Sequence, residues 1–255
     1  MFWLGIIGAA IVLVSGTVCA APSHLGPTGI VGTPTADVVG ARQYDVAADY
    51  VEWDSDVKSW PIRLVAGVAD KLEVGVGYTK WSDGGSIKIT PVNVKAVVAP
   101  ESGSSPAVAV GAGYGKIKDG VDIKITTLYA VATKTLSEAE DNYYDEGGMR
   151  GTVRGSLGIM YNKYSNGGSD SYTEPFASLE YLTPNGNTTL AVEYKTKEND
   201  MDAVSSLLVR HMVTPNTWVQ LGWTNSFYSL GWDDHELFLG IGYRFAPQPE
   251  EEWYY

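Results

Sequence analysis

The sequence has almost no cysteine and little histidine. Its 255 residues include one cysteine, Cys19, and three histidines. Cys19 lies in the N-terminal apolar segment, so disulfides and cysteine-based zinc sites are excluded from the rest of the chain. No metal-ligand spacing such as H-E-x-x-H occurs either. The sequence therefore predicts no metal or other cofactor.

Charge is also scarce, and positive charge most of all. Charged residues make up 19% of the chain, and 18 Lys and Arg against 30 Asp and Glu give a formal net charge of −12. Nucleic-acid binding depends on basic patches that meet phosphate, so nucleic acid is not expected as a partner. Hydrophobic residues nevertheless reach 44%, which excludes a disordered chain.

The N-terminus is typical of an export signal. Residues 1–36 contain no Asp, Glu, Lys or Arg, and Phe2 to Val14 is an apolar run. Val18-Cys19-Ala20 fits a small-residue cleavage site, so 1–20 is predicted to be a signal peptide cut after Ala20. The alternative is an uncleaved anchor, since this stretch is about 20 residues long. No later segment has the ~18 consecutive apolar residues of a helical membrane span.

Most of the remaining chain has a two-residue period. Leu72, Val74, Val76 and Tyr78, for example, alternate with Glu73 and small residues, and this alternation is the pattern of a β-strand. Gly, Asn, Asp and Pro clusters separate such segments and indicate turns. Twelve strands are predicted, at about 42–53, 61–68, 71–81, 86–98, 105–116, 122–134, 150–162, 171–183, 187–197, 203–213, 216–225 and 235–246.

Each strand has one apolar face and one face of small and polar residues. A soluble sandwich would turn the apolar face inward, whereas an outer-membrane barrel would turn it to lipid. The export signal, the even strand count, aromatics near strand ends and the small residues of the polar face favour the barrel. We therefore predict an all-β fold, an antiparallel transmembrane β-barrel of about 12 strands (range 10–14), in the outer membrane of a diderm bacterium. A soluble secreted β-barrel or sandwich that binds a partner is the alternative.

The predicted organisation has four parts. After the signal peptide, residues 21–41 form a periplasmic lead-in segment or a partial plug. Residues 42–246 form the barrel, and 247–255 form an acidic tail. The apolar parity of strand 86–98 changes at Thr90-Pro91, which predicts a β-bulge there, because proline inside a sheet belongs at a bulge or an edge. The connection 135–149 is unusually long.

Charged residues on the small, polar faces are the candidate functional residues. They predict a pore lining, and nine bases against six acids predict a mild anion preference. The alternative is a narrow barrel filled by salt bridges, because buried charges need partners. The candidate lumen-lining residues are Asp45, Asp49, Arg63, Glu73, Lys88, Lys95, Lys124, Lys134, Arg154, Glu180, Glu193, Lys195, Arg210, Glu236 and Arg244.

The histidines give little support for an enzyme. Lipid hydrolysis by a barrel would need a serine beside a histidine base that a third group orients. His24 lies in the lead-in segment, His211 follows Arg210 with no serine two residues further on, and His235 lies in a polar loop. The chain is predicted not to be an enzyme, and a lipid-modifying barrel remains the less favoured alternative.

Three segments resemble known outer-membrane barrels. Gly26 to Asp37, with the sequence GPTGIVGTPTAD, resembles the start of YjbH-type and related outer-membrane β-barrel porins, and Gly67 to Gly75 looks like an early hairpin of such barrels. Gly240, Tyr243 and Phe245 are similar to the C-terminal assembly signal. The resemblance implies outer-membrane lipid, the barrel-assembly machinery and small polar solutes as partners. It implies porin-like passive passage or an accessory role in polysaccharide export.

Fractionation separates the membrane barrel from the soluble alternative. We expect the chain to stay with membranes until detergent is added, because its apolar strand faces contact lipid. We also expect its gel mobility to differ between unheated and boiled samples. Release by buffer alone, with no heat-dependent shift, would establish the soluble alternative.

Overall fold

The computed structural model describes residues 21–24, 26–53, 57–82, 87–118, 122–137, 151–166, 168–196, 203–225 and 235–246. The predicted signal peptide, the acidic tail and most of the 135–149 connection lie outside the described residues. Within the described ranges, no helix is long and apolar enough to cross a membrane.

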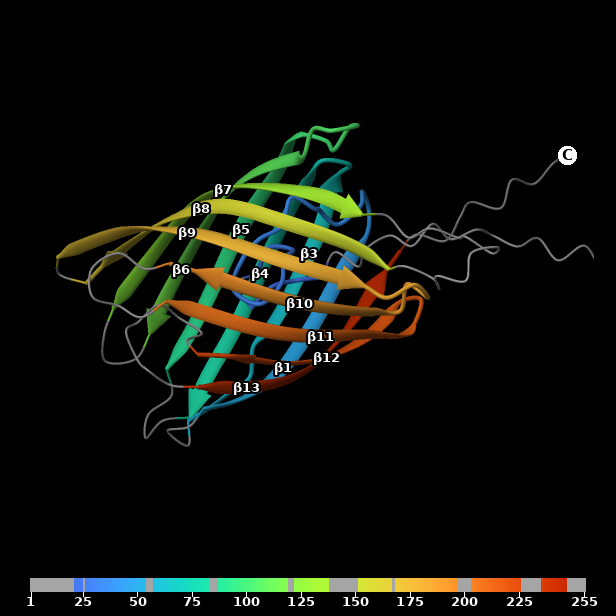
Figure 1. Cartoon of the computed structure of the whole chain (residues 1–255). Coiled ribbons are helices and arrows are strands. Elements are labelled where there is room, and N and C mark those ends of the chain that lie inside the picture. Colours follow the sequence, from blue (N-terminus) through green and yellow to red (C-terminus); the bar gives the residue numbers. More distant parts are fainter. Residues whose placement is uncertain are drawn as a thin grey trace, which may run out of the picture.

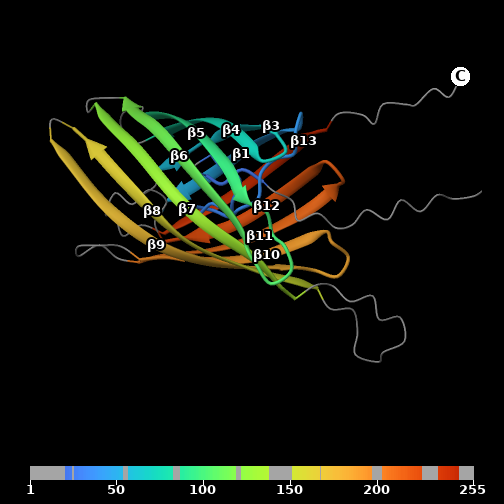
Figure 2. The same cartoon turned by 90° about the horizontal axis from the view of Figure 1, so that it is seen from above.

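The strands form one closed antiparallel barrel (Figures 1 and 2). The last strand pairs with the first along their whole lengths, from Tyr44–Phe245 to Trp53–Glu236, so the sheet has no free edge. The strands are β1 (Tyr44–Trp53), β2 (Lys58–Ser59), β3 (Ile62–Ala69), β4 (Leu72–Ser82), β5 (Lys88–Ala99), β6 (Ala107–Lys118), β7 (Ile123–Ser137), β8 (Thr152–Ser165), β9 (Ser169–Leu182), β10 (Thr188–Lys195), β11 (Val204–Thr214), β12 (Thr217–Thr224) and β13 (Glu236–Phe245).

The predicted fold class is confirmed. Each of the twelve predicted strands overlaps one long strand, and only the two-residue β2 was not predicted. β2 lies between β1 and β4, as β3 does, and is separated from β3 by Trp60-Pro61. Proline cannot donate to the ladder, so β2 and β3 are two parts of one strand position, and the barrel has twelve such positions.

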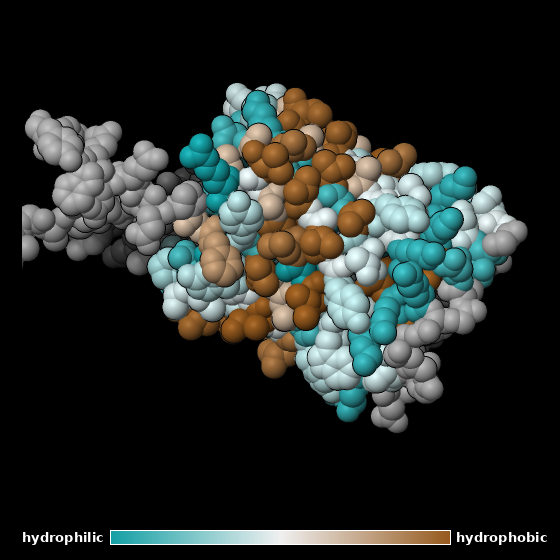
Figure 3. All heavy atoms as spheres, turned by 180° about the vertical axis from the view of Figure 1, so that it is seen from behind, coloured by the Kyte–Doolittle hydropathy of each residue, from teal (hydrophilic) through white to brown (hydrophobic). Residues whose placement is uncertain are grey.

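The barrel is apolar outside and charged inside. In β10, Val192 and Tyr194 are 45% and 48% exposed, while Glu193 and Lys195 are 4% and 2% exposed. Figure 3 shows the outward apolar residues as a band across the wall. A soluble β-sheet has the opposite arrangement, whereas a barrel surrounded by lipid needs this one.

Inward-facing glycines make room for aromatic rings on the neighbouring strand. Trp218 of β12 pairs with Gly242 of β13, and a Cβ at Gly242 would stand inside the van der Waals radius of the Trp218 indole. Such rings across glycines fill the narrow interior and compensate for the missing side chains. The same arrangement joins three more cross-strand pairs, Phe238–Gly222, Tyr129–Gly111 and Phe176–Gly158.

The bulge predicted at Thr90-Pro91 is absent. The β5–β6 register is continuous there and shifts only between Val97 and Ala99. The Cγ atom of Pro91 lies 2.9 Å from the point where a Cβ on Gly77 would stand, so this glycine leaves room for the ring without an extra residue. Ile89 therefore faces the interior and Lys88 is exposed, contrary to the prediction that Lys88 lines the lumen.

The glycine–aromatic pairs predict where the wall tolerates no added carbon. Gly242→Val should destabilise the barrel by about 1–3 kcal/mol, because the fully buried Trp218 cannot move away. Gly168→Val is the matched control, since a Cβ at Gly168 has no neighbour within 4 Å. The measurement is the urea midpoint of the heat-modifiable form in lipid. Equal midpoints for the two variants would contradict the packing role of Gly242.

Candidate functional site

The barrel interior is occupied by the chain itself. Residues 21–39, called here the lumen segment, precede β1 and lie among the inward-facing side chains, visible as the blue trace inside the barrel in Figures 1 and 2. Its described residues are buried, apart from the half-buried Asp37 and Val38. Two isolated bridges, Pro22–Thr28 and Gly29–Pro34, fold it into compact turns.

Glu193 holds the tip of the lumen segment. Its carboxylate accepts hydrogen bonds from the backbone N–H groups of Val31, Gly32 and Thr33 at 3.2, 2.8 and 3.1 Å, and from the Thr33 hydroxyl at 2.7 Å. The Ser206 hydroxyl donates to the same carboxylate at 2.9 Å. Successive N–H groups in a turn form a concave anion site. This carboxylate therefore fixes the turn in one position.

Glu73 and Lys95 join the middle of the same segment to its C-terminal end. Glu73 accepts hydrogen bonds from the N–H groups of Thr28 and Val39 at 2.9 and 3.0 Å. The Lys95 ammonium lies 3.1 Å from Glu73 and donates to the carbonyl oxygens of Thr28 and Thr35 at 2.9 and 3.2 Å. Both side chains are fully buried, so each charge depends on these partners.

Two further ion-pair groups connect the lumen segment to the wall. Asp37 and Arg154 form a bidentate pair with N–O distances of 2.7 and 3.0 Å, the geometry in which guanidinium–carboxylate pairs are strongest. Beside the turn at Val31 to Thr33, Nε2 of His24 lies 2.8 Å from Oδ2 of Asp49. The same carboxylate also pairs with Arg63 of β3. The segment is thus bound to both sides of the barrel.

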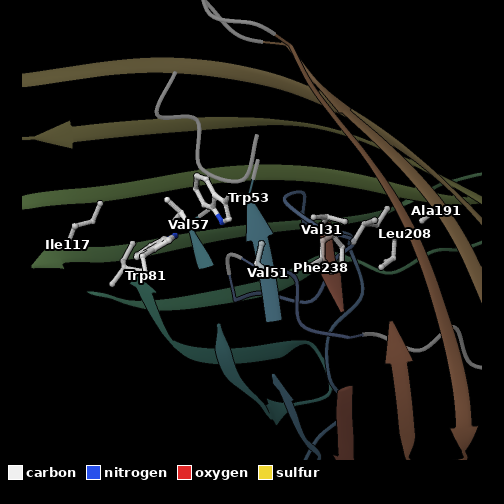
Figure 4. Close-up of a cluster of buried hydrophobic side chains, with 11 residues drawn as sticks. Val31, Val51, Trp53, Val57, Trp81, Ile117, Ala191, Leu208 and Phe238 are labelled. Atoms are coloured by element: carbon white, nitrogen blue, oxygen red, sulfur yellow. The ribbon is translucent and has the colours of Figure 1, made fainter. Parts of the chain in front are cut away.

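Apolar contacts also hold the lumen segment against the wall. Ile30 and Val31 pack in a buried cluster with wall residues that include Val51, Leu208 and Phe238 (Figure 4). The cluster extends along the inner wall toward the barrel end where β1 finishes and β13 begins, called here the far end. The opposite end, where β1 begins, is called the terminal end. The lumen therefore has an apolar sector in addition to its charged one.

Most of the predicted lining residues lie inside the barrel. Arg244 is half-buried and pairs with Asp45 at 2.7 Å. The buried ones are Asp45, Asp49, Arg63, Glu73, Lys95, Arg154, Glu180, Glu193, Lys195, Arg210 and Glu236.

Lys124 and Lys134, like Lys88, are placed differently from the prediction. Lys124 is exposed because Ile123 and Ile125 on either side pack into the apolar sector, where the assumption that apolar residues face outward fails. Lys134 is half-buried at the terminal end and pairs with Glu101 at 2.8 Å. Slight burial raises the pKa of Glu101, but hydrogen bonds from Lys134 and Thr135 outweigh it and hold that pKa below its usual value.

Two interior acids were missed by the prediction. Glu174 is fully buried and accepts a hydrogen bond from Nδ2 of Asn162 at 2.7 Å; it has the same parity as Glu180, so the alternation of β9 contained the signal. Asp37 lies outside any strand, where parity gives no information. Without the three lysines, six of the nine predicted bases remain, whereas the six acids become eight. The predicted basic excess of the lumen is therefore wrong.

The free space beside the lumen segment is small. A cavity of about 80 Å³ lies between the segment and β5–β9, lined among others by Pro34, Ile89, Asn93, Tyr129 and Met160. Such a volume holds about three water molecules. This cavity could therefore hold only a very small solute.

The remaining predicted residues lie on the wall or near its ends. Gly240 faces inward, where its missing side chain leaves room for Asp49, while Tyr243 and Phe245 are exposed with ring centroids 4.6 Å apart. The Thr188 hydroxyl lies 2.9 Å from Nδ1 of His211, and His235 stacks on Trp223. His211 thus has a hydroxyl partner at the end of β10, and His235 an aromatic one on β12.

Comparison with known proteins supports the fold. No protein-family model and no curated protein sequence matches the chain. Among solved structures, the KdgM porin in complex with disordered oligogalacturonate is 12% identical, with TM-score 0.56 over 80% of this chain and 99% of that one. The NanC porin is 10% identical, with TM-score 0.57 over 78% and 98%. The COG4313 outer membrane channel from Pseudomonas putida F1 is 14% identical, with TM-score 0.53 over 84% and 100%.

These similarities define the class of the fold. At this level of identity, the similarity shows the fold alone, which is that of outer-membrane porins and channels. The match extends over nearly the whole length of each solved chain. The YjbH-type resemblance of Gly26 to Asp37 stays a prediction.

The carboxylate of Glu193 provides a test of how the lumen segment is held. Glu193→Gln keeps the size but removes the charge, and hydrogen bonds to charged groups contribute about 1.5–3 kcal/mol. Hydrogen exchange at the amides of Val31, Gly32 and Thr33 should therefore become about tenfold faster or more. Glu52→Gln, on the outer wall, is the control and should leave this exchange unchanged. Unchanged exchange in Glu193→Gln would remove this carboxylate from the anchoring scheme.

Proposed function

We propose that the chain is an outer-membrane barrel with porin-like passage of small polar solutes, and that the lumen segment sets the width of the path. The observation that carries this proposal is the inverted polarity of the wall, together with a lumen occupied by residues 21–39. An apolar exterior fits lipid, and a charged interior fits water and polar solutes. The likeness to porin and channel structures supports the same class.

The interior charge sets the expected selectivity. Among the described residues, eight acids and six bases lie inside, and charged linings determine which ions enter a pore. A weak preference for cations follows, opposite to the preference predicted from the sequence. An accessory role in polysaccharide export is the second candidate, and it rests on the resemblance of Gly26 to Asp37 alone.

Conductance of the mature chain, residues 21–255, tests the proposal. In a planar bilayer with a salt gradient, we expect small, stable current steps and a reversal potential of cation-selective sign. The small size follows from the cavity of about 80 Å³ beside the lumen segment. Insertion without any conductance would contradict porin-like passage and leave a structural or accessory role.

A disulfide lock shows whether the lumen segment must move. The N–H of Ala36 lies 2.8 Å from Oγ1 of Thr133, so cysteines at these two positions are close enough to join. The mature chain has no other cysteine. In the Ala36→Cys/Thr133→Cys variant, oxidation should abolish those current steps that require the lumen segment to move out of the path. Reductant should restore these steps. The Ala36→Cys single variant is the control. Large, porin-sized steps from the oxidised double variant would show that the segment does not limit the path.

A further inference from the structure

Lysines are concentrated on one part of the outer wall. Lys80, Lys88, Lys118, Lys124 and Lys163, called here the lysine row, are all exposed and lie near the far ends of β4, β5, β6, β7 and β8. The whole chain has only 18 lysines and arginines. A chain with so few bases and a net charge of −12 thus places five of them along one rim.

The strand register brings these lysines side by side. Lys88 pairs directly with Lys80 on one side and with Lys118 on the other. Lys163 lies at about the same height on β8, where it is the diagonal neighbour of Lys124 of β7. Like charges directly opposite each other in a sheet are destabilising, with Cβ atoms about 5 Å apart. The arrangement therefore needs an anionic partner to offset the repulsion.

The described part of the chain supplies only one nearby carboxylate to the row: Asp122 acts electrostatically on Lys118 and Lys124, but it is ion-paired with Lys116. The neighbouring Lys116 and Lys58 have carboxylates of their own, Asp122 at 2.9 Å and Glu52 at 3.5 Å. The five members of the lysine row form no ion pair with any described residue. Within the described residues, Lys80, Lys88 and Lys163 thus have no carboxylate at ion-pair distance.

The lysine row has the position of a lipid-headgroup layer. Along β4, the outward residues run from Val74 and Val76 through Tyr78 to Lys80, and along β8 from Ile159 through Tyr161 to Lys163. This order of apolar band, tyrosine and then cation is that of a wall crossing from hydrocarbon to headgroups. Figure 3 shows hydrophilic residues gathered beside the apolar band on this face.

The terminal end has no equivalent row. The lysines described there are Lys71, in the turn after β3, and Lys134, which is bonded to Glu101. The described arginines of that end are the exposed Arg42 and Arg244, which pairs with Asp45, so its bases do not form a row across adjacent strands. A barrel whose termini lie on the periplasmic side presents the far end to the outer leaflet.

We propose that the lysine row is a binding site for the phosphate groups of a phosphorylated glycolipid in the outer leaflet. This inference rests on the outer-membrane placement proposed above, and it adds a lipid ligand that porin-like passage does not require. Lysine binds phosphate as a compact point charge, and several lysines at headgroup level bind anionic lipid cooperatively.

Titration with a defined lipid tests the site. The mature chain in nonionic detergent is titrated with diphosphoryl lipid A, and native mass spectrometry counts the bound lipid. Lys80→Gln/Lys88→Gln/Lys118→Gln should weaken binding at least tenfold, since these exposed side chains can change without disturbing the wall. The matched control Lys71→Gln/Lys134→Gln should bind as the unaltered chain does. Raising the salt concentration should weaken binding by screening.

Each other outcome overturns the proposal. Equal binding by the triple variant would remove the lysine row from the site. Equal affinity for phosphatidylglycerol would replace the glycolipid by anionic lipid in general. The result is separable from the conductance test: a barrel that conducts but does not bind lipid A contradicts only the lipid site, and one that binds without conducting contradicts only porin-like passage.

Discussion

The structure depends on buried carboxylates that need partners inside a closed wall. An apolar exterior forces the charged side chains of alternate residues into a narrow space, where an unpaired charge is strongly destabilising. Glu73 and Glu193 find their partners in backbone N–H groups of the lumen segment, and Asp37 of that segment pairs with Arg154 of the wall. The lumen segment and the barrel are therefore parts of one electrostatic unit, and neither is complete without the other.

The same lack of space explains the composition. The sequence has 29 glycines, eight tryptophans and 16 tyrosines, and the inward glycines of β6, β8, β12 and β13 lie beneath aromatic rings of adjacent strands. Small and large residues alternate across neighbouring strands so that their volumes fit a tapering interior. A wall of uniform medium-sized side chains would leave gaps at some levels and overlap at others.

The strands could be predicted from the sequence because alternation in a wall with two different faces is unambiguous. The inward orientation of charged side chains could also be predicted wherever the inner face is polar, as for Glu73, Glu193 and Arg210. It failed at Lys88 and Lys124, because Ile89, Ile123 and Ile125 give the far end of the lumen an apolar lining, so the usual contrast between the faces is reversed there. Local patterns could not show this reversal, since it depends on residues from β4 to β7 meeting the tip of the lumen segment.

The contacts of the lumen segment are among the most distant in the chain. Thr33 and Glu193 are 160 residues apart, and Asp37 and Arg154 are 117 apart. The groups that bind this segment come from early strands, such as Asp49 of β1 and Glu73 of β4, and from late ones, such as Arg154 of β8 and Glu193 of β10. Closing such long loops is entropically unfavourable until the intervening strands are ordered. The lumen segment therefore has all of its partners only once β10 is ordered, and we expect it to reach its final position late in folding.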